Sequence, residues 1–329
     1  MKAIKFFAIT AMAAAMFSSC SSEDELSQSN YPSDNIIRIT AGVNNAKTRA
    51  EGTGVTQLEK PLSLTVVNNN DDATLAAKYT YVNKVFSKDE NGAWNCSETL
   101  LWQKDTQPVD IVAFAPAQEG KFNGVYANGS IQSITYSVAD DQSTSSDNND
   151  LLYYYAPGFV PKEKLEDKKL NIKMNHAFCM IDIVVTLGTE FNKPEVLKES
   201  PIVKVTLGGT KIGASVDVEN AASFVTANGD ATTITTTKGS FTKATNAEVN
   251  AISNFSCIAI PQTVAANTFK VSLMTADKLY EWTSAEQVEL KSGYRYKLEL
   301  TMGNNVVLLK DAISASPWGN GEGGSLETD

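Results

Sequence analysis

The sequence predicts an all-β protein built from two β-sandwich domains. Apolar and polar residues alternate with a period of two in most segments after about residue 35, which is the pattern of half-buried strands. Turn signals such as Asn91-Gly92 and Asn228-Gly229 separate these segments at roughly ten-residue spacing. The length of 329 residues corresponds to about two domains of roughly 100 to 200 residues each.

The N-terminal segment predicts export. Lys2 and Lys5 precede an apolar run over residues 6–17, which is too short to span a bilayer because spanning needs about 20 residues. Small residues then lead to Cys20, in a pattern that resembles the cleavage and acylation site of lipoproteins. We therefore expect a lipoprotein signal peptide over residues 1–19 and a lipid on Cys20, with ordinary secretory cleavage as the alternative.

The first predicted strand lies within residues 35–43. Ile37, Ile39, Ala41 and Val43 share one face of this strand, because successive side chains of a strand point to opposite sides. The strand is therefore expected to be half-buried, with these four side chains in the core.

Arg49 follows this strand in a polar stretch over residues 44–54, which has two glycines after the arginine. Accessible polar stretches are the usual sites of proteolysis. The other two arginines, Arg38 and Arg295, fall inside predicted strands and are expected to be shielded. Arg49 is therefore the candidate site for an arginine-specific protease, and an ordinary loop charge is the alternative.

Further alternating runs predict the remaining strands of both domains. The polar segment at residues 161–169 is the predicted domain junction, with a surface hairpin loop as the alternative. The expected units are a tether with the first strand (20–49), an N-terminal sandwich (50–165) and a C-terminal sandwich (166–329). The predicted strands cover residues 62–67, 109–115, 131–136, 180–185, 202–207, 255–260, 268–274, 294–300 and 306–309.

Charge and side-chain chemistry exclude several classes of function. The chain has 28 Lys and Arg against 38 Asp and Glu, a net charge of −10, so no overall positive field attracts nucleic acid. His176 is the single histidine, and we interpret it as a structural residue at the start of an apolar strand. No nucleophile, base and orienting group can be selected together. We expect no enzyme activity, no cofactor and no metal.

Two local patterns have alternative interpretations. Cys179 and Cys257 lie in apolar runs, which favours buried free thiols over a disulfide between them. The loop over residues 140–150 is rich in Asp, Ser and Asn, but it lacks the regular ligand spacing of a calcium-binding loop. A solvated loop is the favoured interpretation.

Several motifs, taken in order, resemble the fimbrillin family, the subunits of type V pili. The matching segments are residues 47–50 (KTRA), 110–116 (DIVAFAP), 174–183 (MNHAFCMIDI), 293–300 (GYRYKLEL) and 313–318 (ISASPW). The resemblance covers essentially the whole chain. It implies two tandem transthyretin-like β-sandwich domains, export as a lipoprotein, and an arginine-specific protease that removes the first strand.

The resemblance also implies roles for particular residues. Cleavage between Arg49 and Ala50 would remove the first strand, and a strand from another subunit would then fill the empty groove by donor-strand addition. The C-terminal tail is the expected donor, since Val307, Leu309 and Ile313 lie on one face of it. The alternative is that this tail is the last strand of its own second domain.

We therefore expect a structural or adhesive subunit of cell-surface fimbriae. Its expected partners are other pilin subunits, the outer membrane through acylated Cys20 before processing, and a host protein or glycan receptor. The alternative is a monomeric, lipid-anchored surface module that binds glycans or host proteins. Trp94, Trp102, Trp282 and Trp318 could stack on sugars, although their strand positions favour core packing.

Overall fold

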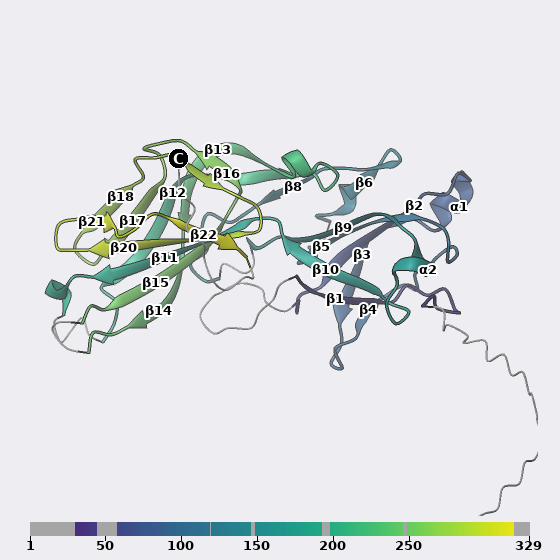
Figure 1. The fold of residues 1–329 in the computed structure, drawn as a ribbon, viewed down its shortest axis with the longest axis horizontal. Helices are drawn as coiled ribbons and strands as arrows, with labels where there is room; N and C mark the ends of the chain where they lie inside the picture. Colours follow the sequence, from purple (N-terminus) through teal and green to yellow (C-terminus); the bar gives the residue numbers. More distant parts are fainter. Residues whose placement is uncertain are drawn as a thin grey trace, which may run out of the picture.

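A computed structural model describes residues 30–44, 58–118, 120–145, 149–192, 198–245 and 249–318. The described chain consists mainly of β-strands, which confirms the predicted all-β class. The molecule is elongated, with β2 to β5 toward one end and β17 to β21 toward the other (Figure 1). The short helical segments are α1 (Ala73–Lys78), α2 (Pro161–Lys164), η1 (Asn123–Val125), η3 (Thr189–Phe191) and η4 (Ala221–Ser223).

The N-terminal half forms a seven-stranded sheet in the order β1-β10-β9-β5-β2-β3-β4. Its central strands are buried on both faces: Ile111 and Ala113 of β5 enter one hydrophobic cluster, and Val112 and Phe114 enter another. Burial on both faces explains the nearly continuous apolar run of this strand. The strands are β1 (Ile39–Val43), β10 (Leu170–His176), β9 (Leu152–Phe159), β5 (Val109–Ala115), β2 (Leu62–Asn68), β3 (Tyr81–Lys88) and β4 (Trp94–Cys96).

The C-terminal half contains two larger sheets, ordered β14-β15-β11-β20-β21 and β13-β12-β17-β18, with β22 added beside β20 and β8 beside β12. The first sheet has β14 (Thr237–Thr242), β15 (Ile252–Ala259), β11 (Cys179–Leu187), β20 (Tyr294–Met302), β21 (Val307–Leu309) and β22 (Ser314–Pro317). The second has β13 (Val225–Thr235), β12 (Ile202–Val216), β17 (Lys270–Thr275), β18 (Leu279–Thr283) and β8 (Ile134–Ser137). Two small ladders pair β6 (Tyr126–Ala127) with β7 (Ser130–Ile131) and β16 (Gln262–Val264) with β19 (Val288–Leu290).

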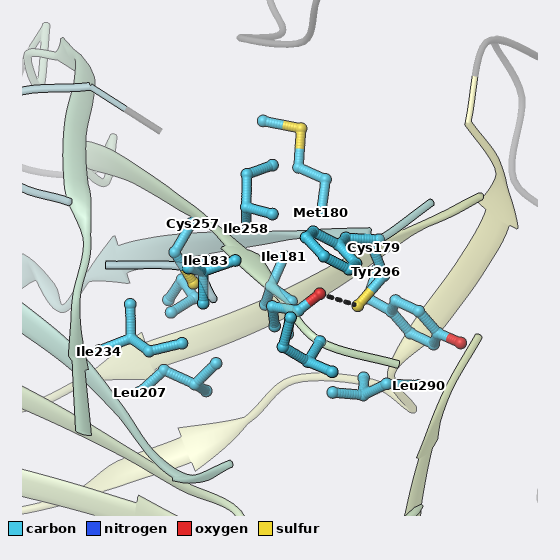
Figure 2. Packing of buried hydrophobic residues seen from close by; sticks show 14 of the residues in the cluster. Cys179, Met180, Ile181, Ile183, Leu207, Ile234, Cys257, Ile258, Leu290 and Tyr296 are labelled. Atoms are coloured by element: carbon cyan, nitrogen blue, oxygen red, sulfur yellow. Dashed lines mark hydrogen bonds between the residues drawn. The ribbon is translucent and has the colours of Figure 1, made fainter. Parts of the chain in front are cut away.

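The core between these two sheets is built from strand side chains of alternating direction. Ile181 and Ile183 of β11 lie in the same cluster as Leu207 of β12 and Ile234 of β13 (Figure 2). All four side chains are fully buried. The apolar surface removed from water here is the main source of stability of this half of the chain.

The segment predicted as a domain junction instead connects two strands of the first sheet. Residues 161–169 form α2 and a tight turn between β9 and β10, which pair antiparallel. Their polar character therefore reflects a solvated hairpin connection, the alternative interpretation. The boundary expected after residue 165 falls inside the first sheet, and the chain passes from one hydrophobic cluster to the other between Met174 and Ala177.

The two halves of the chain are also interlocked. Strand β8 comes from the first half of the sequence but pairs antiparallel with β12 in the second half. Phe114 stacks on Phe122 with ring centroids 4.9 Å apart, and Tyr136 packs against Phe178 at 5.4 Å. These rings belong to one apolar cluster that extends from the first sheet into the second half of the molecule.

Gln142 extends the ladder of β15 beyond the first residue of the neighbouring strand β14, Thr237. Its side chain is fully buried, Nε2 donates to the carbonyl of Ile258 at 2.9 Å, and Oε1 accepts from the amide of Ile258 at 2.8 Å. The side-chain amide thus replaces a backbone partner for a buried residue, and it ties the segment after β8 to the second half.

Gln142→Ala is expected to destabilise the protein by about 2 to 6 kcal/mol, because two buried backbone groups lose partners at about 1 to 3 kcal/mol each. Urea unfolding followed by circular dichroism measures this change. Gln287→Ala, at an exposed position, is the control and is expected to shift stability by less than about 0.5 kcal/mol. Equal stability of the two variants would contradict the role given to Gln142.

Cys96, Cys179 and Cys257 are free thiols, which confirms the interpretation of Cys179 and Cys257 as buried free cysteines. On the paired strands β11 and β15, Cys179 lies opposite Ala259 and Cys257 lies opposite Ile181. The thiol of Cys179 donates to the carbonyl of Ala259 at 3.2 Å (Figure 2). Burial raises the pKa of both thiols, since it disfavours the charged thiolate.

Iodoacetamide at pH 8 is therefore expected to alkylate half-buried Cys96 at least about tenfold faster than Cys179 and Cys257. A pKa raised by burial keeps the two buried thiols protonated at this pH, and their surroundings exclude the reagent. Peptide mass spectrometry measures the labelling of each cysteine. In guanidinium chloride the three rates should converge; fast labelling of Cys257 in the native protein would argue against this packing.

Candidate assembly site

The predicted removable strand lies at the edge of the first sheet. β1 pairs parallel with β10 through five residue pairs, from Ile39 opposite Leu170 to Val43 opposite Met174. Ile37 and Ile39 are each 4% exposed, and the half-buried side chains of Ala41 and Val43 pack against the same cluster. The four residues thus lie on one apolar face, in accordance with their alternation in the sequence.

The residues just before β1 pair with the loop that follows β4. The amide of Ile37 donates to the carbonyl of Leu100 at 2.9 Å, and the amide of Trp102 donates to the carbonyl of Asn35 at 2.8 Å. Leu100 and Trp102 follow β4, the last strand of the sheet order. The segment 35–43 therefore bonds to β10 at one end of the sheet order and to the loop that follows β4, the strand at the other end.

β10 depends on β1 for most of its backbone pairing. Its ladder with β9 covers only Asn175 and His176, whereas its first five residues pair with β1. A shallow groove runs along the outer side of the β1–β10 pair. It is lined by Thr40, Ala41, Gly42, Val43, Asn44, Asn171 and Lys173.

The arginines differ in their environments. Arg38 was expected to be shielded, but its side chain is exposed and forms an ion pair with Asp34. This pairing, together with the amide of Ile36, lowers the pKa of Asp34 below its usual range. Arg295 is partly buried against Asp182. Arg49 and Ala50, the predicted cleavage site, lie outside the described residues, as does Cys20.

The C-terminal tail lies along β20 of its own chain. Val307 and Leu309 of β21 pair opposite Met302 and Leu300, and β22 pairs with the beginning of β20. Val307 is buried, and the partly buried side chains of Leu309 and Ile313 pack against the same core. This placement corresponds to the alternative expectation, in which the tail is the last strand of its own second half.

The tail is apolar on both of its faces. Val306 and Leu308 are 50% and 58% exposed, although the neighbouring Val307 is buried. The host sheet therefore covers one face of this segment and leaves the other in contact with solvent. Apolar side chains on both faces are typical of a strand that is covered on both sides.

The end of the tail is bound to the single histidine. Trp318 stacks on His176 with ring centroids 3.8 Å apart and planes inclined by 2°. His176 Nδ1 donates to Asp150 Oδ2 at 2.8 Å, and both side chains are buried. His176 is thus a structural residue with a partner, as predicted. Its contact with Trp318 was not predicted, because the two residues are 142 positions apart in the sequence.

The surroundings of His176 do not form a hydrolytic triad. Ser292 is the adjacent hydroxyl, and its Oγ donates to the carbonyl of Ala177 at 2.7 Å rather than to the imidazole. Within the described ranges, no group of three or more His, Cys, Asp or Glu side chains could hold a metal ion. The described part also contains no helix with the length and apolarity needed to cross a membrane.

The tryptophans do not form an exposed stacking surface. Trp94, Trp102 and Trp318 are each at most 9% exposed, and half-buried Trp282 lies edge-on to Phe269. These positions agree with core packing.

In the loop before β9, Asp141 accepts a hydrogen bond from the amide of Ser143 at 2.9 Å, so Asp141 stabilises a local turn.

The chain is similar in sequence to one protein family and in fold to several solved structures. The fimbrillin-like family matches residues 48–318. No curated protein matches the chain significantly. A candidate cell adhesion protein from Bacteroides uniformis has a TM-score of 0.58 at 16% identity, with 87% of this chain and 99% of that chain covered. A second, from Bacteroides ovatus, has a TM-score of 0.59 at 18% identity, with 86% and 96% covered.

These two likenesses are below 25% identity and concern the fold alone. The family match covers far more than half of the chain and includes β2 to β22, the sheets and the tail described above. The chain belongs to the fimbrillin-like family.

Proposed function

We propose that this protein is a non-enzymatic structural or adhesive subunit of cell-surface fimbriae, assembled by exchange of strands between copies. Membership of the fimbrillin-like family supports a pilus or adhesin subunit at the cell surface. The observation that carries the strand-exchange part is the segment 35–43. This segment pairs with β10 through five residue pairs and also hydrogen-bonds to the loop that follows β4, the last strand of the sheet order.

Removal of this segment would leave a groove with two deficits. Buried Ile37 and Ile39 would no longer cover the core, at about 1.5 to 3 kcal/mol for each large apolar side chain. The backbone of β10 would also lose its partner along Leu170 to Met174. A strand from a second copy can correct both deficits, with backbone hydrogen bonds along β10 and apolar side chains in the emptied positions.

The tail of another copy is the proposed donor. Its Val306 to Leu309 segment is apolar on both faces, while its own sheet covers only one of them. Val307, Leu309 and Ile313 would enter the acceptor groove. In this proposal the chain is exported as a lipoprotein through Cys20, reaches the outer membrane, and is cleaved between Arg49 and Ala50 to free the groove.

The proposed unit requires no cofactor or metal, and its partners are other pilin subunits. Adhesion would add a host protein or glycan receptor. The family's two tandem transthyretin-like sandwiches are the proposed division of the fold. Pairing of the tail with its own β20 is the observation that favours the alternative, a monomeric lipid-anchored binding module, because such a chain is already self-complete.

Treatment of the purified precursor with an arginine-specific protease is expected to convert monomers into polymers. Arg49→Ala should remain monomeric because its first strand stays in place, whereas Lys47→Ala is the matched control and should assemble. Size-exclusion chromatography and electron microscopy measure the products. Polymers formed by Arg49→Ala with its first strand intact would refute cleavage as the switch.

A labelled peptide of residues 304–318 tests the groove separately. It should bind the cleaved chain but not the intact precursor, since β1 occupies the acceptor position before cleavage. Fluorescence anisotropy measures this binding. A chain that is verifiably cut at Arg49, stays monomeric and does not bind the peptide would favour the monomeric binding module.

A further inference from the structure

The last described residue of the tail, Trp318, is held by a ring stack and a backbone hydrogen bond. Its ring lies parallel to the imidazole of His176 at 3.8 Å, and its amide donates to the carbonyl of Gly293 at 2.7 Å. The Trp318 side chain is 8% exposed and belongs to the hydrophobic cluster of the second half. Removal of this ring from its site would therefore expose a large apolar surface.

The site that receives Trp318 is assembled from the end of β10 and the turn before β20. The amide of Gly293 donates to the carbonyl of Phe178 at 2.9 Å, and Ser292 Oγ donates to the carbonyl of Ala177 at 2.7 Å. Gly293 has a φ of +72°, which a residue with a side chain rarely adopts. The turn at Gly293 therefore packs directly against the backbone just after β10. His176, the last residue of β10, contacts both Asp150 and Trp318.

β1 ends beside the same site. The amide of Asn44 donates to the carbonyl of Met174 at 2.7 Å, and Asn44 Nδ2 donates to Asn175 Oδ1 at 3.1 Å. Asn175 therefore contacts the segment that follows β1, and the next residue, His176, is stacked on Trp318. The two segments that take part in the proposed strand exchange meet at adjacent residues of β10.

The pairing of β10 makes this contact sensitive to β1. Five residues of β10 pair with β1, and only Asn175 and His176 pair with β9. Loss of β1 would leave β10 attached to its sheet through the two residues nearest Trp318. A segment with fewer protected backbone hydrogen bonds opens locally at a lower free energy.

We propose that His176 and Trp318 form a latch that keeps the tail on its own chain while β1 is in place and releases it when β1 is lost. Loss of β1 thereby exposes the acceptor groove and frees the donor tail in one step. The second copy as recipient of the tail rests on the proposed function. The coupling between β1 and Trp318 is a property of a single chain and is tested without cleavage or assembly.

Hydrogen exchange of the dilute, monomeric precursor, measured by mass spectrometry, tests the latch. Trp318→Ala should accelerate exchange in peptides covering residues 310–317 by about tenfold, since the end of the tail loses its stacking contact. Leu308→Ala is the matched control: it shortens an exposed side chain of the same tail and should leave this exchange within about twofold.

The coupling to β1 is tested by weakening that strand. Ile39→Ala should accelerate exchange in the tail and at the end of β10 by about tenfold, while peptides of β17 stay within about twofold of the wild type. Thr40→Ala, at an exposed position of the same strand, is the control. Val43→Ala, at a half-buried position, is a milder variant if Ile39→Ala does not fold.

Unchanged tail exchange in Trp318→Ala, or in a folded β1 variant, would overturn the latch. Equal acceleration in β17 would overturn it as well, because the effect would then be global unfolding. These outcomes are separate from a failure of strand exchange: polymers could form with no latch, and a latch could exist in a chain that never polymerises.

Discussion

The parallel ladder between β1 and β10 is the interaction on which the rest of the first sheet depends. Five of the seven residues of β10 pair with β1 in this ladder. The segment that contains β1 also contributes Ile37 and Ile39 to the core. Because residues 35–37 also bond to the loop that follows β4, one short segment satisfies backbone groups of β10 and of a loop next to the strand at the other end of the sheet order.

The shared core determines how changes in the first half reach the second. Phe114, Phe122 and Phe178 belong to one cluster, and β8 contributes its backbone to a sheet of the other half. Gln142 adds buried hydrogen bonds between the segment after β8 and β15. A close-packed interior transmits displacement, so the relative position of the two halves is set by packing and pairing rather than by a linker.

Much of the fold could be predicted from the sequence, because alternation and turn residues are local signals. The apolar face of the first strand and the buried thiols of Cys179 and Cys257 follow from such patterns. The junction near Pro161 was misplaced because a polar hairpin connection and an interdomain linker have the same composition. The pairing of β8 with β12 and the stacking of Trp318 on His176 depend on long-range register, which no local pattern contains. Cys20 and Arg49 remain predictions.

The division of the tail into two short strands has a consequence for the solubility of the precursor. β21 and β22 cover β20 in separate pieces, and exposed Lys310 and Asp311 stand between them. A long, flat, apolar edge strand would pair with any neighbouring chain and lead to aggregates, whereas short edges with charged residues resist this. The interrupted edge would therefore allow many copies to accumulate in a confined compartment without irregular β-aggregation.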